Sequence, residues 1–326
     1  MSSRSTLVIV LALILLTIIS FSHGQLQLGF YSSTCPDVED IVTSVVRDAI
    51  LSDPTVAAAL LRMHYHDCFV HGCDASVLIE GPRAERGALN HAGLRGFDVI
   101  ERAKSELEEE CPGVVSCADI VALAARDSIV MSDGPSYEVP TGRRDGRRSN
   151  MSDADNMPEL RDSVDVLRAK FAEKGLSETD LVLLSAAHTI GTTACFFMER
   201  RLYDFAPDSN SDPSISPDFL PELESQCPRG GDVNARLPLD RGSEWSFDDG
   251  ILRNIRGGFA VLESDAKLYL DESTQSIIDS YFGFFSSIFG PFFESDFTDS
   301  IVRMGQIGVK TGSHEGEIRQ VCSAFN

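Results

Sequence analysis

Apolar residues recur along this chain mainly with helical spacing. In segment 98–110 the apolar positions fall on one helix face: Val99, Ile100, Ala103 and Leu107. Segment 55–67, "TVAAALLRMHYHD", is apolar over most of its length and follows Asp53-Pro54, a pair that suits a helix start. No stretch alternates apolar and polar residues as a half-buried strand would. The pattern predicts a mainly α fold.

Serine followed three residues later by aspartate predicts two more helix starts, at Ser116 and at Ser177. Stretch 204–221 is rich in Asp, Ser and Pro and is expected to form a long surface loop. No linker, repeat or low-complexity segment divides the chain. We therefore expect one domain over residues 25–326.

The N-terminus has the pattern of a secretory signal peptide. Residues 7–16 are apolar without a break, and Ser22 and Gly24 are small residues of a cleavage pattern. A membrane anchor needs about 20 apolar residues. Removal of residues 1–24 is therefore the preferred interpretation, and it leaves 326 − 24 = 302 residues.

The mature chain is strongly acidic. The full chain carries a net charge of −22, and loss of Arg4 gives −22 − 1 = −23. Such a surface repels nucleic acid and anionic lipid, so we expect neither nucleic-acid nor membrane partners. The charge suits a protein acting on small neutral or cationic molecules, although solubility alone explains it equally well.

The eight cysteines all follow the signal segment, and an even number in a secreted chain predicts four disulfides. Buried free thiols are the alternative. Spacing alone does not select among the 105 possible pairings.

Two separate segments bring histidines into apolar helices. Arg62 and His66 are four residues apart and share a helix face, and His188 continues a stripe with Leu181 and Leu184. Each histidine taken alone is explained as well by a structural role in the core. Taken together, two helices that each offer an inward histidine could face each other across a planar cofactor.

Hard oxygen donors crowd the loop after His66: the side chains of Asp67, Asp74 and Ser76 and the carbonyls of Val70 and Gly72. This set suits Ca²⁺, although its spacing is not that of an EF-hand. A zinc site would instead use Cys68, Cys73 and a histidine. In an oxidising compartment a Cys68–Cys73 disulfide is favoured over zinc.

At this point the chain resembles a known family. The segments "LLRMHYHDCFVHGCDASVLI" and "DLVLLSAAHTIG" resemble the distal and proximal haem motifs of the plant secretory (class III) haem peroxidases. Further segments match in the same order: "FYSSTCP", "LRGFDVIE", "CPGVVSCADIVALAARD", "VPTGRRDG" and "ESDAKLY". The resemblance covers residues 25–326 and implies the haem-peroxidase fold, with haem b between a distal and a proximal helical half and with two Ca²⁺ ions.

On the distal side the resemblance implies that Arg62 and His66 face the peroxide. Asn90 is expected to hydrogen-bond His66; it is found by counting back from "LRGF", because the chain is one residue shorter than usual between Glu85 and Asn90. Glu85 is expected to reach the distal calcium through water. That ion would be held by Asp67, Val70, Gly72, Asp74 and Ser76.

On the proximal side the resemblance makes His188 the axial iron ligand and Asp265 its carboxylate partner. A proximal calcium site is implied at Thr189, Asp240, Ser243, Ser246 and Asp248, with Ser243 where threonine is usual and Ser246 contributing its carbonyl.

Other positions take their expected roles from the same resemblance. The implied disulfides are Cys35–Cys111, Cys68–Cys73, Cys117–Cys322 and Cys195–Cys227. Asp119 and Arg143 resemble a buried ion pair, Pro158 a substrate-access residue and Phe197 an aromatic at the haem edge. Tyr65 stands before the distal histidine, where the family usually has Phe.

The resemblance implies a secreted, monomeric enzyme of the apoplast or cell wall. It would reduce hydrogen peroxide to water and oxidise phenolic donors by one-electron steps. Asn150, in the only N-x-S/T sequon, is the expected glycosylation site. Two alternatives are a haem-free, calcium-stabilised extracellular binding protein that retains the fold and a metal-dependent hydrolase using the histidine cluster.

Overall fold

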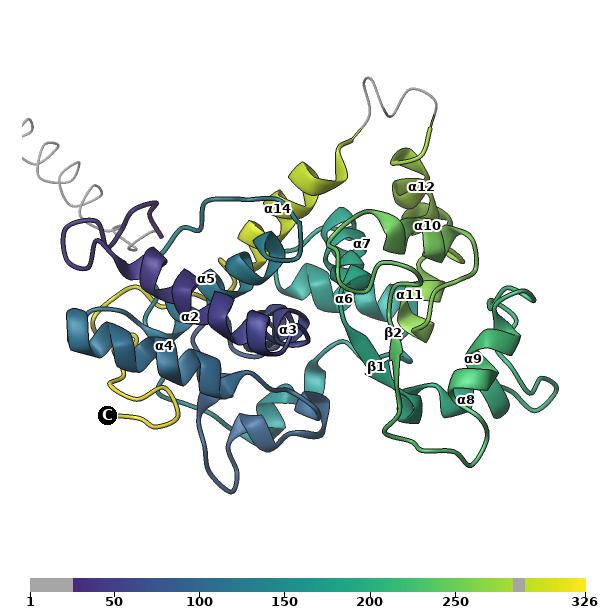
Figure 1. Cartoon of the computed structure of the whole chain (residues 1–326), viewed down its shortest axis with the longest axis horizontal. Helices are drawn as coiled ribbons and strands as arrows, with labels where there is room; N and C mark the ends of the chain where they lie inside the picture. The colour runs from purple at the N-terminus through teal and green to yellow at the C-terminus, as the bar shows by residue number, and fades with distance from the viewer. Residues whose placement is uncertain (1–25, 284–290) are drawn as a thin grey trace, which may run out of the picture.

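The computed structural model describes residues 26–283 and 291–326, so the predicted signal peptide lies outside the described residues. The N-terminal half is built from four helices whose apolar faces meet: α2 (Val38–Ser52), α3 (Val56–Phe69), α4 (Phe97–Glu110) and α5 (Cys117–Val130). In Figure 1 these helices group together, with the C-terminal residues beside them. The predicted apolar face of α4 is buried in this group.

The rest of the chain forms a second helical group. Its α-helices are α6 (Val164–Glu173), α7 (Glu178–Ser185), α8 (Glu199–Tyr203), α9 (Leu220–Gln226), α10 (Gly250–Arg256), α11 (Glu263–Lys267), α12 (Glu272–Ser280) and α14 (Phe293–Met304). Short 3₁₀ helices occur throughout: η1 (Ser76–Leu78), η2 (Glu85–Gly87), η3 (Leu89–His91), η4 (Met151–Asn156), η5 (Ala186–Thr189) and η6 (Cys195–Phe197). The fold is mainly α, as predicted.

A small antiparallel sheet pairs β1 (Thr192–Ala194) with β2 (Arg236–Pro238). The sequence pattern did not reveal it, because three residues are too few to show an alternation. Gly191, just before β1, has a φ of +96°, and a Cβ built there would lie 2.6 Å from the Cβ of Ala58. Glycine therefore lets the segment after η5 lie directly against α3.

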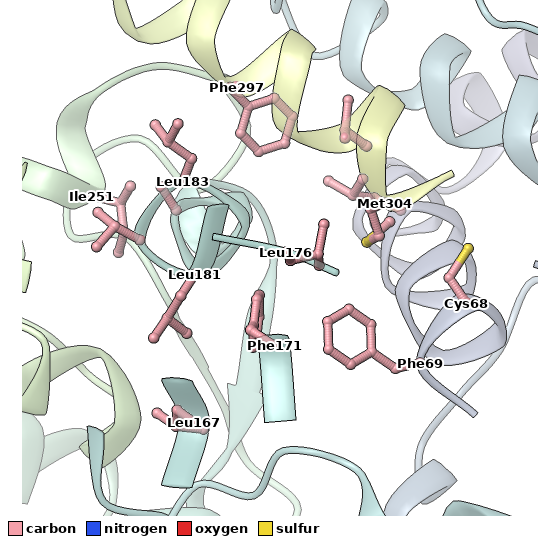
Figure 2. Close-up of a cluster of buried hydrophobic side chains, with 14 of the residues drawn as sticks. Cys68, Phe69, Leu167, Phe171, Leu176, Leu181, Leu183, Ile251, Phe297 and Met304 are labelled. Atoms are coloured by element: carbon pink, nitrogen blue, oxygen red, sulfur yellow. The ribbon is translucent and has the colours of Figure 1, made fainter. Parts of the chain in front are cut away.

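One apolar cluster joins the two helical groups (Figure 2). Phe69 at the end of α3 packs against Phe171 of α6, with ring centroids 4.8 Å apart. Leu181 of α7 and Met304 of α14 belong to the same cluster. Truncating a buried phenylalanine costs about 3–5 kcal/mol, so this contact is a substantial link between the helices that carry the two histidines.

All eight cysteines are paired, and the four pairs are those that the resemblance implied: Cys35–Cys111, Cys68–Cys73, Cys117–Cys322 and Cys195–Cys227. The expected ion pair is also present: Arg143 Nη1 lies 2.8 Å from Asp119 Oδ1, and both side chains are buried. Asp119 also accepts a hydrogen bond from the Tyr31 hydroxyl at 2.7 Å.

The helix starts agree with the sequence in part. Ser177 and Asp180 form a complete capping box before α7. Ser116 accepts a hydrogen bond from the Asp119 amide at 3.1 Å, so it caps α5. Helix α3, however, begins at Val56 rather than at Pro54, because the Asp53 carboxylate accepts from the Thr55 amide in a turn before the helix.

The expectation of a surface loop over 204–221 is wrong in part. Asp212 is buried and pairs with Arg201 Nε of α8 at 2.7 Å. Ile215 and Phe219 are buried in an apolar cluster with Leu223 of α9. The polar composition concealed these three inward side chains. Over the described residues, every helix is too short or too polar to cross a bilayer.

Candidate active site

Helix α3 presents the distal pair on one face. His66 is 5% exposed, whereas Arg62 is exposed and donates a hydrogen bond from Nη2 to the Ala92 carbonyl at 3.2 Å. Burial, and then the positive charge of Arg62, hold the pKa of His66 well below its usual value. His66 is therefore a neutral imidazole, which is the form that can accept a proton.

A second histidine contacts the first. Nδ1 of His66 lies 2.9 Å from Nδ1 of His91, the last residue of η3, and both rings are buried. On the far side of the His91 ring, Nε2 lies 3.5 Å from Glu85 Oε1. Burial and the charge of Arg62 lower the pKa of His91 to about 4. The three buried side chains of Glu85, His91 and His66 thus lie in a row.

The expectation that Asn90 hydrogen-bonds His66 is wrong. The Asn90 amide donates instead to the Ala154 carbonyl of η4 at 2.8 Å. Adjacent residues of the 3₁₀ turn η3 point in different directions, so His91 rather than Asn90 reaches α3. The one-residue shortening therefore lies after His91 rather than before it. Counting six residues forward from Glu85, rather than back from Leu94, leads to His91.

The proximal histidine has a different partner. His188 lies in η5, where the α-helix expected from the sequence has already ended at Ser185. Its Nδ1 lies 3.0 Å from Oδ2 and 3.1 Å from Oδ1 of Asp265, a buried residue of α11. Burial lowers the pKa of His188, but the Asp265 carboxylate outweighs it and the pKa ends above its usual value. The positive charge of Arg62 also acts to lower the pKa of His188.

The five residues expected at the proximal calcium converge. Thr189 Oγ1 lies 3.0 Å from Asp240 Oδ2 and 3.5 Å from the Ser246 carbonyl. Ser243 Oγ lies 3.0 Å from Asp240 Oδ2 and 3.3 Å from Asp248 Oδ1. Burial raises the pKa of Asp240 to about 6. Two carboxylates, two hydroxyls and a carbonyl form an oxygen set that fits a hard cation.

The oxygens expected at the distal calcium site include several that lack a hydrogen-bond partner. Within the described residues, four buried oxygens have no hydrogen-bond partner: Asp67 Oδ1, Ser76 Oγ and both carboxylate oxygens of Glu85. Burial and the neighbouring Asp74 raise the pKa of Asp67 to about 8, and burial and Asp67 raise that of Glu85 to about 9. A bound cation would offset the repulsion between these buried carboxylates and would lower their pKa values.

Two lysines reach the same distal oxygens. Lys310 Nζ contacts Asp74 Oδ2, and Lys174 Nζ donates to the Val70 carbonyl at 2.8 Å. Gly72 has a φ of +108°, and a Cβ there would lie 2.6 Å from the Ile307 carbonyl oxygen. Among described residues no three His, Cys, Asp or Glu side chains group as a metal site, so a cation here would depend on hydroxyl and carbonyl oxygens as well.

The remaining expected residues lie nearer the surface. Tyr65 is half-buried, with its ring centroid 5.4 Å from that of His66 and 4.4 Å from that of Phe69. Phe197 is 44% exposed, and Pro158 is half-buried after η4. Asn150, the sequon residue, is exposed.

Comparison with known proteins identifies the class that this fold and site define. The family model described as "Peroxidase" matches residues 42–283. The chain is 61% identical to Peroxidase 43 of Arabidopsis thaliana over 318 residues, which covers 97% of each protein. It is 56% identical to Peroxidase 13 of the same plant, covering 94% of this chain and 95% of the relative.

A tobacco relative gives the same result: Peroxidase N1 of Nicotiana tabacum is 53% identical, covering 92% of this chain and 90% of the relative. The chain belongs to the peroxidase family, and within it to the plant secretory haem peroxidases. It is a peroxidase that acts on hydrogen peroxide. The haem-free binding protein considered above is not favoured.

Proposed function

We propose that the protein reduces hydrogen peroxide at a haem b held between His66 and His188, and that it oxidises small phenols by one-electron steps. One observation carries the proposal: the two histidines have opposite partners. His66 faces a neutral imidazole, whereas His188 faces a buried carboxylate. A neutral base and an electron-rich metal ligand are the two forms that peroxide reduction requires of these histidines.

On the distal side His66 acts as the proton carrier. Its neutral imidazole takes a proton from one peroxide oxygen and returns it to the other, which leaves as water. Arg62, four residues earlier on the same face, stabilises the negative charge that develops as the O–O bond breaks. Acid–base transfer of this kind contributes about 10²–10⁴-fold to the rate.

On the proximal side His188 would bind the iron. When bound, the haem would supply the two electrons that reduce peroxide, and two one-electron donors would then replace them. Asp265 accepts the Nδ1 proton of His188 and so makes this ligand more basic. The hydrogen bond also fixes the ring orientation, because the carboxylate is itself held in α11.

Two calcium ions would stabilise the segments that carry His66 and His188. The distal ion would be bound by Asp67, Val70, Gly72, Asp74 and Ser76, with Glu85 reached through water. The proximal ion would be bound by Thr189, Asp240, Ser243, Ser246 and Asp248. Asp67 follows His66 directly, and Thr189 follows His188 directly. Each ion would therefore support the position of one histidine.

The donors would approach an exposed edge of the site. Phe197 offers an aromatic face in solvent, and Pro158 is the proposed access residue. Phenols stack on aromatic rings and give up single electrons readily.

We further propose that residues 1–24 are removed as a signal peptide, and that residues 25–326 fold as one haem peroxidase domain. The protein would act as a monomer in the apoplast or cell wall, with at most one N-glycan, at Asn150. The charge of −23 would keep it mobile among acidic wall polymers.

An absorption spectrum and a donor panel test the proposal. The secreted protein is expected to show the Soret band of a high-spin ferric haem. It should consume peroxide in proportion to phenol oxidised, at two phenols for each peroxide. A purified, folded protein without a Soret band after haem addition would contradict it. So would peroxide loss that is independent of any phenol.

A further inference from the structure

The contact between His66 and His91 constrains one proton. Their Nδ1 atoms face each other at 2.9 Å, and the rings are tilted by 54° with centroids 4.9 Å apart. At this distance one nitrogen must donate and the other accept. Two N–H groups would repel each other, and two bare nitrogens would leave buried acceptors without a proton between them.

The proposed role of His66 decides which ring donates. Nδ1 of His66 faces His91, so a base here acts through Nε2 and carries its own proton on Nδ1. His91 then carries its proton on Nε2, a buried atom without a hydrogen-bond partner among the described residues, which lies 3.5 Å from the buried Glu85 Oε1. In that tautomer Nδ1 of His91 is a bare acceptor.

We propose that His91 is the positioning residue of the distal base. It accepts the Nδ1 proton of His66 and thereby directs the His66 Nε2 lone pair toward peroxide. The proposal rests on the proposed function, because it assigns to His66 the role of base. His91 touches neither peroxide nor haem in this account and acts only through His66.

The arrangement predicts which side chains can replace His91. An asparagine at this position offers an amide oxygen to His66 and an amide N–H to Glu85, so it preserves both contacts. A leucine of similar volume offers neither and leaves the Nδ1 proton of His66 without an acceptor. Asn90, whose amide is bonded to Ala154, offers the competing assignment from the neighbouring position.

Three variants of the haem-loaded protein test the proposal: His91→Leu, His91→Asn and Asn90→Ala. Stopped-flow spectroscopy measures the first reaction with peroxide, the binding of cyanide and the later oxidation of a phenol. Cyanide is a useful probe because it arrives as HCN and gives its proton to the same distal base. Its binding therefore reports on His66 without turnover.

His91→Leu should slow both the peroxide reaction and cyanide binding by about 10- to 100-fold, the usual cost of losing a group that orients a ligand or base. Phenol oxidation, haem content and melting temperature should change little. His91→Asn should recover most of both rates, and Asn90→Ala should stay close to the parent. The proposal would be overturned by parent rates in His91→Leu or by equal losses in the Leu and Asn variants. It would also be overturned by a loss of rate in Asn90→Ala alone.

A measurement on the unaltered protein covers the case in which His91→Leu fails to fold. Nitrogen-15 NMR of the histidine-labelled holoenzyme should show His91 protonated at Nε2 and bare at Nδ1, and His66 protonated at Nδ1. The reverse tautomers would overturn the proposal. A parent protein that lacks haem or does not react with peroxide would instead contradict the proposed function, so the two failures are distinguishable.

Discussion

The two histidines of the site are the same residue in opposite electrostatic surroundings. His66 on α3 meets a neutral ring at Nδ1, and burial together with the positive charge of Arg62 lowers its pKa. His188 in η5 meets the Asp265 carboxylate at Nδ1, and its pKa rises despite burial. The residue type therefore does not distinguish the proposed base from the proposed metal ligand. The partner of Nδ1 does, and that partner comes from a distant segment.

The largest expected difference between the two sides comes from deleting each imidazole. His188→Ala should lose or badly loosen the haem, because it removes the proposed iron ligand. His66→Ala should keep the haem and slow peroxide reduction by about 10²–10⁴-fold. Haem content by absorbance and stopped-flow peroxide kinetics measure the two effects. A His66→Ala protein with normal peroxidase rates would remove His66 from its role.

Asp265→Asn tests the proximal surroundings alone. The amide can still accept the Nδ1 proton of His188 but carries no charge, so the raising effect on the His188 pKa is lost and burial dominates. We expect a higher iron reduction potential and activity lower by about 10- to 100-fold. Ser264→Ala, which removes only a hydroxyl 3.4 Å from Asp265 Oδ1, is the matched control. An unchanged potential in Asp265→Asn would contradict the assignment.

Calcium removal should affect both sides together. At 100 times its dissociation constant, an ion bound only by the folded state stabilises it by about 2.7 kcal/mol, and chelation removes that stabilisation. Melting temperature and activity should therefore fall in parallel. Asp74→Asn and Asp248→Asn should each lower the calcium content by one ion, on the distal and the proximal side respectively. Calcium-free protein, verified by metal analysis, with an unchanged melting temperature would refute the coupling.

The smallest effect is expected at Tyr65, which contacts only the distal side. Its phenol lies beside the His66 ring and resembles the proposed donors, so it could reduce the oxidised enzyme when no outside donor is present. Tyr65→Phe should slow that spontaneous return to the resting state. The rate of the first peroxide reaction should stay within severalfold, since His66 and Arg62 remain. Tyr203→Phe, whose hydroxyl bonds the Cys227 carbonyl, is the control. Equal decay in all three proteins would leave Tyr65 as a packing residue.

Local patterns predicted the helices well, because an apolar face and a capping pair are read within a few residues. The complete capping box at Ser177 and the buried face of α4 are examples. The pairings that cross the molecule, such as His188 with Asp265, were found through the family resemblance. Their residues are 77 positions apart, and no local spacing connects them.

The error at Asn90 has a physical cause. A one-residue shortening can be absorbed anywhere in a loop, and spacing does not show where. In the structure η3 directs His91 toward α3 and Asn90 toward η4. The sequence does offer a sign of this contact. His91 is a histidine in a short segment that also holds Leu89, Ala92 and Leu94, which are apolar. The polar stretch after α8 differs from the prediction for a similar reason, since Asp212 is polar but is buried against Arg201.

The pH dependence of the first peroxide reaction tests the central claim most directly. A histidine whose pKa lies at the usual value of about 6.5 loses half of its neutral form there. His66 has a folded pKa well below that value, so its neutral, active form persists as the pH falls through 6.5 and is lost only at markedly lower pH. The account predicts a stopped-flow rate constant for peroxide that is flat across pH 6.5 and declines well below it. A rate constant that has already fallen by half at or above pH 6.5 would contradict the account.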